Sequence, residues 1–266
     1  MSEHTWNIAT ASVVGTSHAA SGKPCQDEHR AEIVGGKRGQ CLIACVADGA
    51  GSATKGDLGA RIACRTWLRD TSIYIEEGWR FRDDYGQTWV QKAREELLSR
   101  ATVDKAPMSD YACTFLGACV QPRGAVFVQI GDGAIVFNSI GELGKFEPVF
   151  WPEQGEYANT TSFLTDLSAS QNIRSRTFSA RIDELALFSD GLQRIALDYQ
   201  NRGAFNPFFE SMLHHVRPPS LEDRESLSRA LASFLSSEDV NSRTDDDKTL
   251  VLASRLGFPN HVQEEL

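Results

Sequence analysis

The apolar positions near the N-terminus fall in short runs that predict strands over residues 6–14, 28–34 and 40–47, of which the second is the weakest. The residues GGKRG at 35–39 have the composition of a tight turn and join the second run to the third. In QCLIACVA, residues 40–47, both alternating faces are apolar. We therefore expect this strand to be covered on both sides.

A helical period replaces the strand pattern in other parts of the chain. Apolar residues recur at helical spacing over 57–70 and predict a helix that is capped near Asp57. Similar patterns predict helices over residues 87–100, 205–216 and 221–236.

The middle of the chain returns to short β-type runs, at residues 112–121, 125–130 and 134–139. The turn sequences PRG and GDG separate them, which predicts an antiparallel meander. Residues 151–175 are polar and aperiodic, so we expect a long loop or a small lid there.

Two further runs, at 184–189 and 248–254, predict strands late in the chain. Strands joined by hairpins, with helices grouped between the strand runs, favour an α+β fold with antiparallel sheets over a doubly wound parallel sheet. No internal repeat or low-complexity linker divides the chain.

Composition narrows the class of protein. The 266 residues are 41% hydrophobic and carry a net charge of -9, with the basic residues scattered. We expect neither a nucleic-acid partner nor a membrane partner. The N-terminus lacks a secretion signal, and no run approaches the ~20 apolar residues of a membrane span. Cysteines inside apolar runs suggest reduced core residues, so we expect a soluble cytoplasmic protein.

Five aspartates share one context, because each lies where an apolar run meets a flexible turn. They are Asp27 in CQDEH, Asp48 in VADGAG, Asp132 in QIGDGA, Asp190 in LFSDGL and Asp246 in TDDDKT. A single Asp-Gly pair is more often a turn than a metal ligand. Carboxylates that meet at one edge of stacked sheets repel one another, however, and need a cation. Oxygen ligands of this kind suit Mg²⁺ or Mn²⁺ better than zinc.

The ordered motifs resemble the metal-dependent protein phosphatases of the 2C type, particularly the compact bacterial members. They are Asp27, DGAG at 48–51, GDG at 131–133, SDG at 189–191 and DDKT at 246–249. The resemblance spans residues 6–254 and implies a single phosphatase domain over 1–266, with 255–266 as a C-terminal tail. It also implies a four-layer α-β-β-α sandwich of two antiparallel sheets flanked by helices, with a binuclear Mn²⁺ or Mg²⁺ centre at one end.

The family assigns a role to each motif. Asp48 matches the carboxylate that bridges the two metals, and Gly49 offers its backbone carbonyl to one of them. Asp190 and Asp246 match ligands of the other metal, while Asp27 matches a residue that holds metal-bound water. Asp132, together with Asp190, matches the third-metal site of bacterial relatives. Two ions about 4 Å apart activate a bridging water for in-line attack on phosphorus, without a covalent phosphoenzyme.

The chain departs from the family pattern at three places. Gly22 stands where many members carry an arginine that grips phosphate, so Lys23 or His18 is the candidate for that role. Ala50 replaces the histidine proposed as general acid in eukaryotic relatives. Either His18 substitutes, or metal-bound water protonates the leaving group, or good leaving groups are preferred. Gln26 replaces an acidic residue, which weakens metal affinity modestly.

The resemblance implies a phosphatase that acts on phosphoserine and phosphothreonine in proteins and is paired with a Ser/Thr kinase. A catalytically silent module that binds phosphoproteins is the alternative from another class. Retention of the five aspartates argues against it, because a binding module has no need of a repulsive carboxylate cluster. The same centre would also serve a small phosphorylated metabolite.

Overall fold

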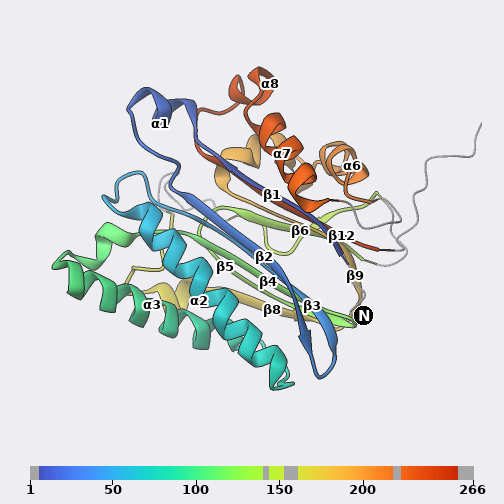
Figure 1. The fold of residues 1–266 in the computed structure, drawn as a ribbon, viewed down its shortest axis with the longest axis horizontal. Helices are drawn as coiled ribbons and strands as arrows, with labels where there is room; N and C mark the ends of the chain where they lie inside the picture. The colour runs from blue at the N-terminus through green and yellow to red at the C-terminus, as the bar shows by residue number, and fades with distance from the viewer. Residues whose placement is uncertain (1–5, 140–143, 153–160, 218–222, 257–266) are drawn as a thin grey trace, which may run out of the picture.

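The computed structural model describes residues 6–139, 144–152, 161–217 and 223–256. They form two five-stranded antiparallel sheets packed face to face, with helices on both outer faces (Figure 1). The expected α+β class and the α-β-β-α arrangement are confirmed. Residues 257–266, most of the expected C-terminal tail, lie outside the described residues.

The first sheet joins strands from both ends and the middle of the chain. Its order is β1 (Trp6–Val13), β12 (Lys248–Arg255), β9 (Ile182–Phe188), β6 (Ala134–Ser139) and β7 (Glu147–Pro148). The N-terminal and C-terminal strands are hydrogen-bonded neighbours, so the sheet closes only when nearly the whole chain is present.

The second sheet is built mostly from neighbouring hairpins. Its order is β2 (Asp27–Gly36), β3 (Gly39–Asp48), β4 (Phe115–Gln121), β5 (Gly124–Ile130) and β8 (Arg174–Phe178). The predicted turn at 35–39 is the β2–β3 hairpin, in which Gly36 pairs with Gly39.

Helices cover each outer face. The long helices α2 (Gly56–Glu76) and α3 (Tyr85–Asp104) pack on the second sheet, and α6 (Asn206–His214) and α7 (Arg224–Leu235) pack on the first (Figure 1). The shorter elements are α1 (Thr16–Ala20), α4 (Ala169–Asn172), α5 (Gln193–Ala196), α8 (Glu238–Asn241), the 3₁₀ turns η1 (Met108–Tyr111) and η2 (Asp190–Leu192), and a small hairpin of β10 (Leu197–Asp198) and β11 (Gly203–Ala204).

Strand β3 has the burial that its sequence predicts. Leu42 and Val46 belong to the core between the sheets, whereas Ile43 and Cys45 face α2 and α3. All four side chains are buried, because sheet and helices cover opposite faces of this strand. Of the residues predicted as buried thiols, Cys41, Cys45, Cys113 and Cys119 are each at most 1% exposed.

The predicted meander is wrong at its third strand. β4 and β5 form a hairpin, but β6 belongs to the other sheet, where it pairs with β9 and β7. The GDG sequence is therefore a crossover between the two sheets. Gly131 has φ +94°, a left-handed conformation that glycine adopts without strain. A Cβ there would also lie 2.6 Å from the side chain of Thr114.

Two other expectations need correction. α2 is longer than predicted, and Lys55 rather than Asp57 occupies its N-cap, with no side-chain cap hydrogen bond. Asp57 lies in the first turn, where its charge interacts favourably with the helix dipole. The segment 151–175 is not one long loop, because it contains α4 and the beginning of β8. Residues 153–160 of it lie outside the described residues.

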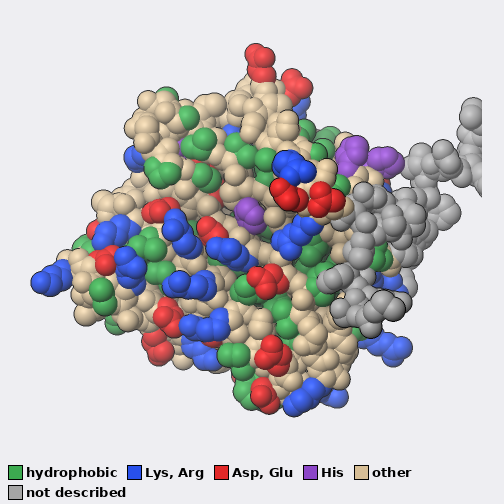
Figure 2. Space-filling model, in the orientation of Figure 1, with side chains coloured by type: hydrophobic (Ala, Val, Ile, Leu, Met, Phe, Trp, Pro, Cys, Tyr) green, Lys and Arg blue, Asp and Glu red, His purple; other side chains and the backbone are tan. Residues whose placement is uncertain are grey.

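Among the described residues, none of the helices combines the length and the apolar character needed to cross a membrane. Figure 2 shows Lys and Arg side chains interspersed with Asp and Glu across the face that carries β2 and α2.

Candidate metal centre

The second sheet brings two of the five aspartates together by its register. β2 begins at Asp27 and β3 ends at Asp48, and the antiparallel pairing places these residues directly opposite each other. Directly opposite residues of neighbouring strands have Cβ atoms about 5 Å apart. The hairpin alone therefore makes these two carboxylates neighbours, although the full length of β2 and β3 lies between them in the sequence.

The first sheet brings the other three aspartates to one end. β9 leads directly into Asp190, β12 begins just after Asp246, and β6 begins just after Asp132. Phe188, at the end of β9, pairs with the beginning of both other strands. The expectation that these strand ends share one edge is thus met within this sheet.

Ser189 connects the two sheets beside these carboxylates. Its hydroxyl donates a hydrogen bond of 2.7 Å to Oδ2 of Asp27 and accepts one of 3.0 Å from the backbone N–H of Thr249. Ser189 is 2% exposed. Ser189 belongs to the SDG motif, of which the sequence indicates a role for the aspartate only. The role of the serine depends on the contact between the two sheets.

Asp48, which lies opposite Asp27, experiences the charge of carboxylates from both sheets. Its pKa is raised well above the usual value, first because the group is buried and then because Asp27, Asp190 and Asp246 add negative charge around it. Negative charges from both sheets therefore act on Asp48.

Asp190 experiences the charge of Asp132, the fifth of the predicted positions. Burial, followed by the charges of Asp132, Asp246 and Asp27, raises its pKa to about 7. The pKa of Asp27 is raised to about 6, again mainly by burial, while hydrogen bonds from Thr249 and Ser189 act in the opposite direction. Without a cation these carboxyl groups hold protons that ordinary ones lose, first because burial disfavours their ionised forms and then because the neighbouring negative charges repel one another.

This chemistry fits a hard divalent cation. Oδ1 of Asp27 is buried and has no hydrogen-bond partner among the described residues, so an acceptor atom is available at the centre of the cluster. In the described part of the chain, no group of three or more His, Cys, Asp and Glu side chains is arranged to hold a metal ion. The fit therefore rests on the oxygen donors themselves, which are the ligands that Mg²⁺ and Mn²⁺ prefer.

Two glycines allow the loops to pack closely. A Cβ on Gly49 would lie 2.4 Å from the backbone of Gly56, so the loop after Asp48 can turn into α2 only with glycine at this position. A Cβ on Gly191 would lie 2.1 Å from the carbonyl oxygen of Asp247. The glycine of each Asp-Gly pair is therefore required for close packing as well as for the turn.

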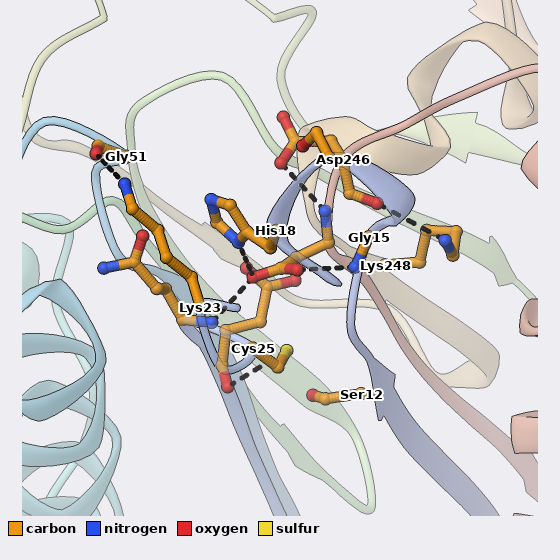
Figure 3. Close-up of polar contacts among 12 residues, drawn as sticks. Ser12, Gly15, His18, Lys23, Cys25, Gly51, Asp246 and Lys248 are labelled. Carbon is orange, nitrogen blue, oxygen red and sulfur yellow. Dashed lines mark hydrogen bonds and ion pairs between the residues drawn. The ribbon is translucent and has the colours of Figure 1, made fainter. Parts of the chain in front are cut away.

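Asp247 is a functional candidate that the sequence did not reveal. It is 2% exposed, and its carboxylate accepts hydrogen bonds from the backbone N–H of Gly15 at 2.7 Å and of Gln26 at 2.6 Å. It also contacts Nδ1 of His18 at 2.9 Å (Figure 3). One carboxylate thus fixes both ends of the segment that carries His18 and Lys23.

The candidate residues of this segment differ in their surroundings. The ring of His18 is 14% exposed and is held by Asp247. Lys23 is exposed, and its ammonium group donates a long hydrogen bond of 3.4 Å to the carbonyl of Gly51, in the loop that follows Asp48 (Figure 3). Gly22, which replaces the arginine of other members, has φ +69°, a conformation in which an arginine would be strained.

The other two departures, Ala50 and Gln26, both contact the loop after Asp48. Ala50 is 7% exposed and packs in a small apolar cluster with Ala53 and Ala112, so its immediate surroundings among the described residues are apolar. The side-chain amide of Gln26 donates to the carbonyl of Ala53 at 3.4 Å, which connects it to the loop after Asp48 rather than to a carboxylate.

Comparison with known proteins shows the family. The sequence model described as Protein phosphatase 2C matches residues 14–236, most of the chain. The chain therefore belongs to the protein phosphatase 2C family and is a phosphatase. Serine/threonine-protein phosphatase 3 of Escherichia coli (strain K12) is 37% identical over 252 residues, which cover 94% of this chain and 98% of that protein.

Solved structures share the fold at lower sequence identity. A bacterial serine phosphatase superposes with a TM-score of 0.57 at 16% identity, covering 96% of this chain and 100% of the other. The catalytic domain of the serine/threonine protein phosphatase PstP, in complex with two manganese ions, has a TM-score of 0.58 at 14% identity, covering 95% and 99%. These likenesses confirm the sandwich fold.

Proposed function

We propose that this phosphatase removes phosphate from phosphoserine and phosphothreonine in proteins with the help of bound Mn²⁺ or Mg²⁺. The observation that supports the proposal is the strand register, which pairs Asp27 with Asp48 in one sheet and brings the strand ends next to Asp132, Asp190 and Asp246 together in the other. The named relative, a serine/threonine-protein phosphatase that matches along nearly its whole length, supports the substrate class.

The residues present define how two ions would be held. Asp48 would contribute to both, Gly49 would add its carbonyl to one, and Asp190 and Asp246 would complete the other. Asp27 would hold a water of this centre, and Asp132 with Asp190 would bind a third ion. The bound ions would neutralise the phosphoryl oxygens and supply a water that is nucleophilic near neutral pH.

We propose that a side chain of this protein supplies the proton to the leaving oxygen. Because an ionised carboxylate only accepts hydrogen bonds, Asp247 fixes the proton on Nδ1 of His18. Nε2 is then the atom that would carry the second proton of the imidazolium and give it to the serine or threonine oxygen as the P–O bond breaks. We propose this role for His18 over water or a preference for good leaving groups, because Asp247 holds the ring in one orientation.

Lys23 is the proposed phosphate contact. It is exposed, on the same segment as His18, and its side chain reaches the carbonyl of Gly51 beside the candidate centre. An ammonium group would bind phosphate as a point charge, with less geometric specificity than the arginine it replaces.

The biological setting follows from the substrate. We propose that a Ser/Thr kinase produces the phosphoprotein and that the reaction takes place in the cytoplasm. All six cysteines are free thiols in the structure, as is usual in a reducing compartment.

Hydrolysis of a phosphothreonine peptide with and without Mn²⁺ tests the function. We expect metal-dependent phosphate release by the wild type and a loss on the order of 100-fold or more for Asp48→Ala and Asp190→Ala, since several kcal/mol of charge stabilisation disappear. Asp239→Ala, which removes an exposed aspartate of α8, is the matched control and should retain activity.

Three outcomes would contradict this assignment. Binding of the phosphopeptide without any release of phosphate would identify the silent binding module instead. Release from small phosphomonoesters but not from any phosphopeptide would favour a metabolite phosphatase. Equal rates for the wild type and Asp48→Ala would show that the centre is elsewhere.

A further inference from the structure

Beside the candidate centre, a short hairpin presents side chains that the proposed reaction does not use. After Asp190 the chain continues through α5 into β10 and β11, and the turn between these strands carries Tyr199 and Arg202. Tyr199 is 40% exposed, and Arg202 and the nearby Arg194 are also exposed. Neither arginine forms an ion pair with a carboxylate of the described residues.

Hydrogen bonds connect this hairpin to Asp132. The side-chain amide of Gln193 donates to the backbone carbonyl of Asp132, and the Tyr199 hydroxyl donates to Oε1 of Gln193 at 2.5 Å. These two hydrogen bonds place the hairpin beside Asp132, at the edge of the candidate centre.

The hairpin is ordered by its own contacts. The Asp198 carboxylate accepts hydrogen bonds from the backbone N–H groups of Gln200 and Asn201 at 3.0 and 3.1 Å, which fixes the turn. Arg202 has φ +50°, an uncommon conformation for a residue with a side chain. The turn around Arg202 therefore holds its backbone in a conformation that arginine itself does not favour.

Aromatic contacts restrict the position of the Arg202 side chain. The ring of Trp151 meets Tyr199 edge to face, with centroids 5.5 Å apart, and Cζ of Arg202 lies 5.9 Å from the Trp151 centroid. A guanidinium group placed over an aromatic ring keeps its donors free for a partner while its position is restricted. Less rotamer freedom is then lost when it binds a ligand.

We propose that Arg194 and Arg202 select protein substrates that carry acidic residues near the phosphorylated serine or threonine. This inference rests on the proposed function. An acidic polypeptide approaching a chain of net charge -9 is repelled unless basic groups lie where it binds. Two exposed arginines without an intramolecular ion pair to any described carboxylate, beside the cluster of aspartates, supply that complementarity and match carboxylates with paired N–H donors.

Contacts with these two arginines would also distinguish protein substrates from small metabolites. An extended peptide advances by about 3.3 Å per residue, so side chains a few positions from the phosphoresidue can reach beyond the metal centre to a neighbouring surface. A small phosphorylated metabolite has no such flanking segment. The arginines should therefore affect peptides and leave a small phosphomonoester unaffected.

The test compares three substrates in the presence of Mn²⁺. They are a phosphothreonine peptide with glutamates on both sides, the same peptide with glutamines, and p-nitrophenyl phosphate. The enzymes are the wild type, the double variant Arg194→Gln/Arg202→Gln, and Arg123→Gln. Arg123 is an exposed arginine in the β4–β5 turn, at the end of β5 opposite to the one that leads toward Asp132, so its variant is the matched control.

We expect the wild type to prefer the acidic peptide by about tenfold in kcat/KM, which two weak ion pairs provide. The double variant should lose this preference, and its kcat/KM for p-nitrophenyl phosphate should stay within about twofold of the wild type. Raising the ionic strength should weaken the preference of the wild type, because exposed ion pairs are screened.

The proposal is overturned if the wild type shows no preference, if the double variant keeps it, or if Arg123→Gln loses it to the same extent. An equal loss toward p-nitrophenyl phosphate would also overturn it, since that result indicates damage to the centre. If the wild type hydrolyses none of the three substrates with Mn²⁺, the proposed function itself fails and this inference fails with it.

Discussion

His18 is held through Nδ1 by the buried carboxylate of Asp247, and this contact determines which ring nitrogen is available to a substrate. The same carboxylate binds the backbone at Gly15 and at Gln26. Asp247 thus acts on the candidate general acid in two ways, because it orients the ring directly and fixes the segment that carries it. We regard Asp247 as a positioning residue and His18 as the group that would touch the substrate.

Replacing His18 by alanine should slow poor leaving groups more than good ones. We expect kcat for a phosphothreonine peptide to fall by about 100-fold, because the alkoxide of threonine needs a proton as it departs. For p-nitrophenyl phosphate, whose leaving group is stable as an anion, the loss should be much smaller. Steady-state kinetics on both substrates measure the ratio.

His215→Ala is the control, since His215 is exposed at the end of α6. Its kinetics should match the wild type on both substrates. If His18→Ala lowers kcat equally for both substrates, His18 is not the general acid and has only a structural role through its contact with Asp247.

The positions of the five aspartates could be predicted from the sequence because each stands at the end of an apolar run. Within TDDDKT, where three consecutive carboxylates share one context, the match to the family motif selects Asp246, and nothing in the sequence indicates a role for Asp247. The pairing of Lys248 with Val13 fixes how β12 begins and therefore which aspartate is turned inward. In the folded chain the carbonyl of Asp245 binds Ser17, Asp246 is exposed, and Asp247 is buried.

At the scale of elements, the first sheet depends on an ion pair beneath α6. Arg217, just beyond this helix, donates two hydrogen bonds to the Glu184 carboxylate of β9, at 2.6 and 3.0 Å. The arginine side chain is 6% exposed and that of Glu184 is 0% exposed. Glu210 of α6 accepts from the same guanidinium group, so the pair fastens the helix to the strand.

Glu184→Ala should lower the free energy of unfolding by about 3 kcal/mol, because it leaves Arg217 buried with only one carboxylate partner. Urea denaturation followed by circular dichroism measures the change. Glu225→Ala is the control, since its contact with Arg229 lies on the exposed face of α7 and should contribute no more than about 0.5 kcal/mol. Equal effects of the two substitutions would show that the buried pair does not stabilise the fold.

Strands and helices were predictable because their periods differ, but the sheet to which a strand belongs was not. The PRG turn joins β4 to β5 within one sheet, whereas GDG carries the chain from β5 to β6 in the other. Both are short turns between apolar runs, and glycine suits a hairpin and a crossover alike. Only contacts distant in sequence, such as β6 with β9, distinguish the two.

At the scale of the whole molecule, the sandwich concentrates negative charge where its two sheets meet. Ser189 of the first sheet contacts Asp27 of the second, and Asp48 interacts with aspartates of both. A cation bound among these residues would link the sheets. Metal removal should therefore affect the stability of the whole domain as well as catalysis.

The pH dependence of the metal-free protein follows from the direction of the pKa shifts. Asp27 and Asp190 have raised pKa values of about 6 and about 7 when folded, against an ordinary value of 3.8. Between these values the folded protein binds more protons than the unfolded chain, so this contribution to stability falls as the pH rises. It is fully present below the ordinary value and is lost as the pH passes through the folded pKa values.

Scanning calorimetry in a chelator, on wild type and Asp190→Asn, isolates this contribution from that of other titrating groups. From about pH 5 to about pH 8, the Tm of the wild type should fall relative to that of Asp190→Asn, because the amide has no charge to bury. Excess Mn²⁺ should then raise the wild-type Tm more at about pH 8 than at about pH 5, since the ligands must be deprotonated to bind it. Equal stabilisation by Mn²⁺ at both pH values, or in wild type and variant alike, would mean that the ion does not bind at this cluster.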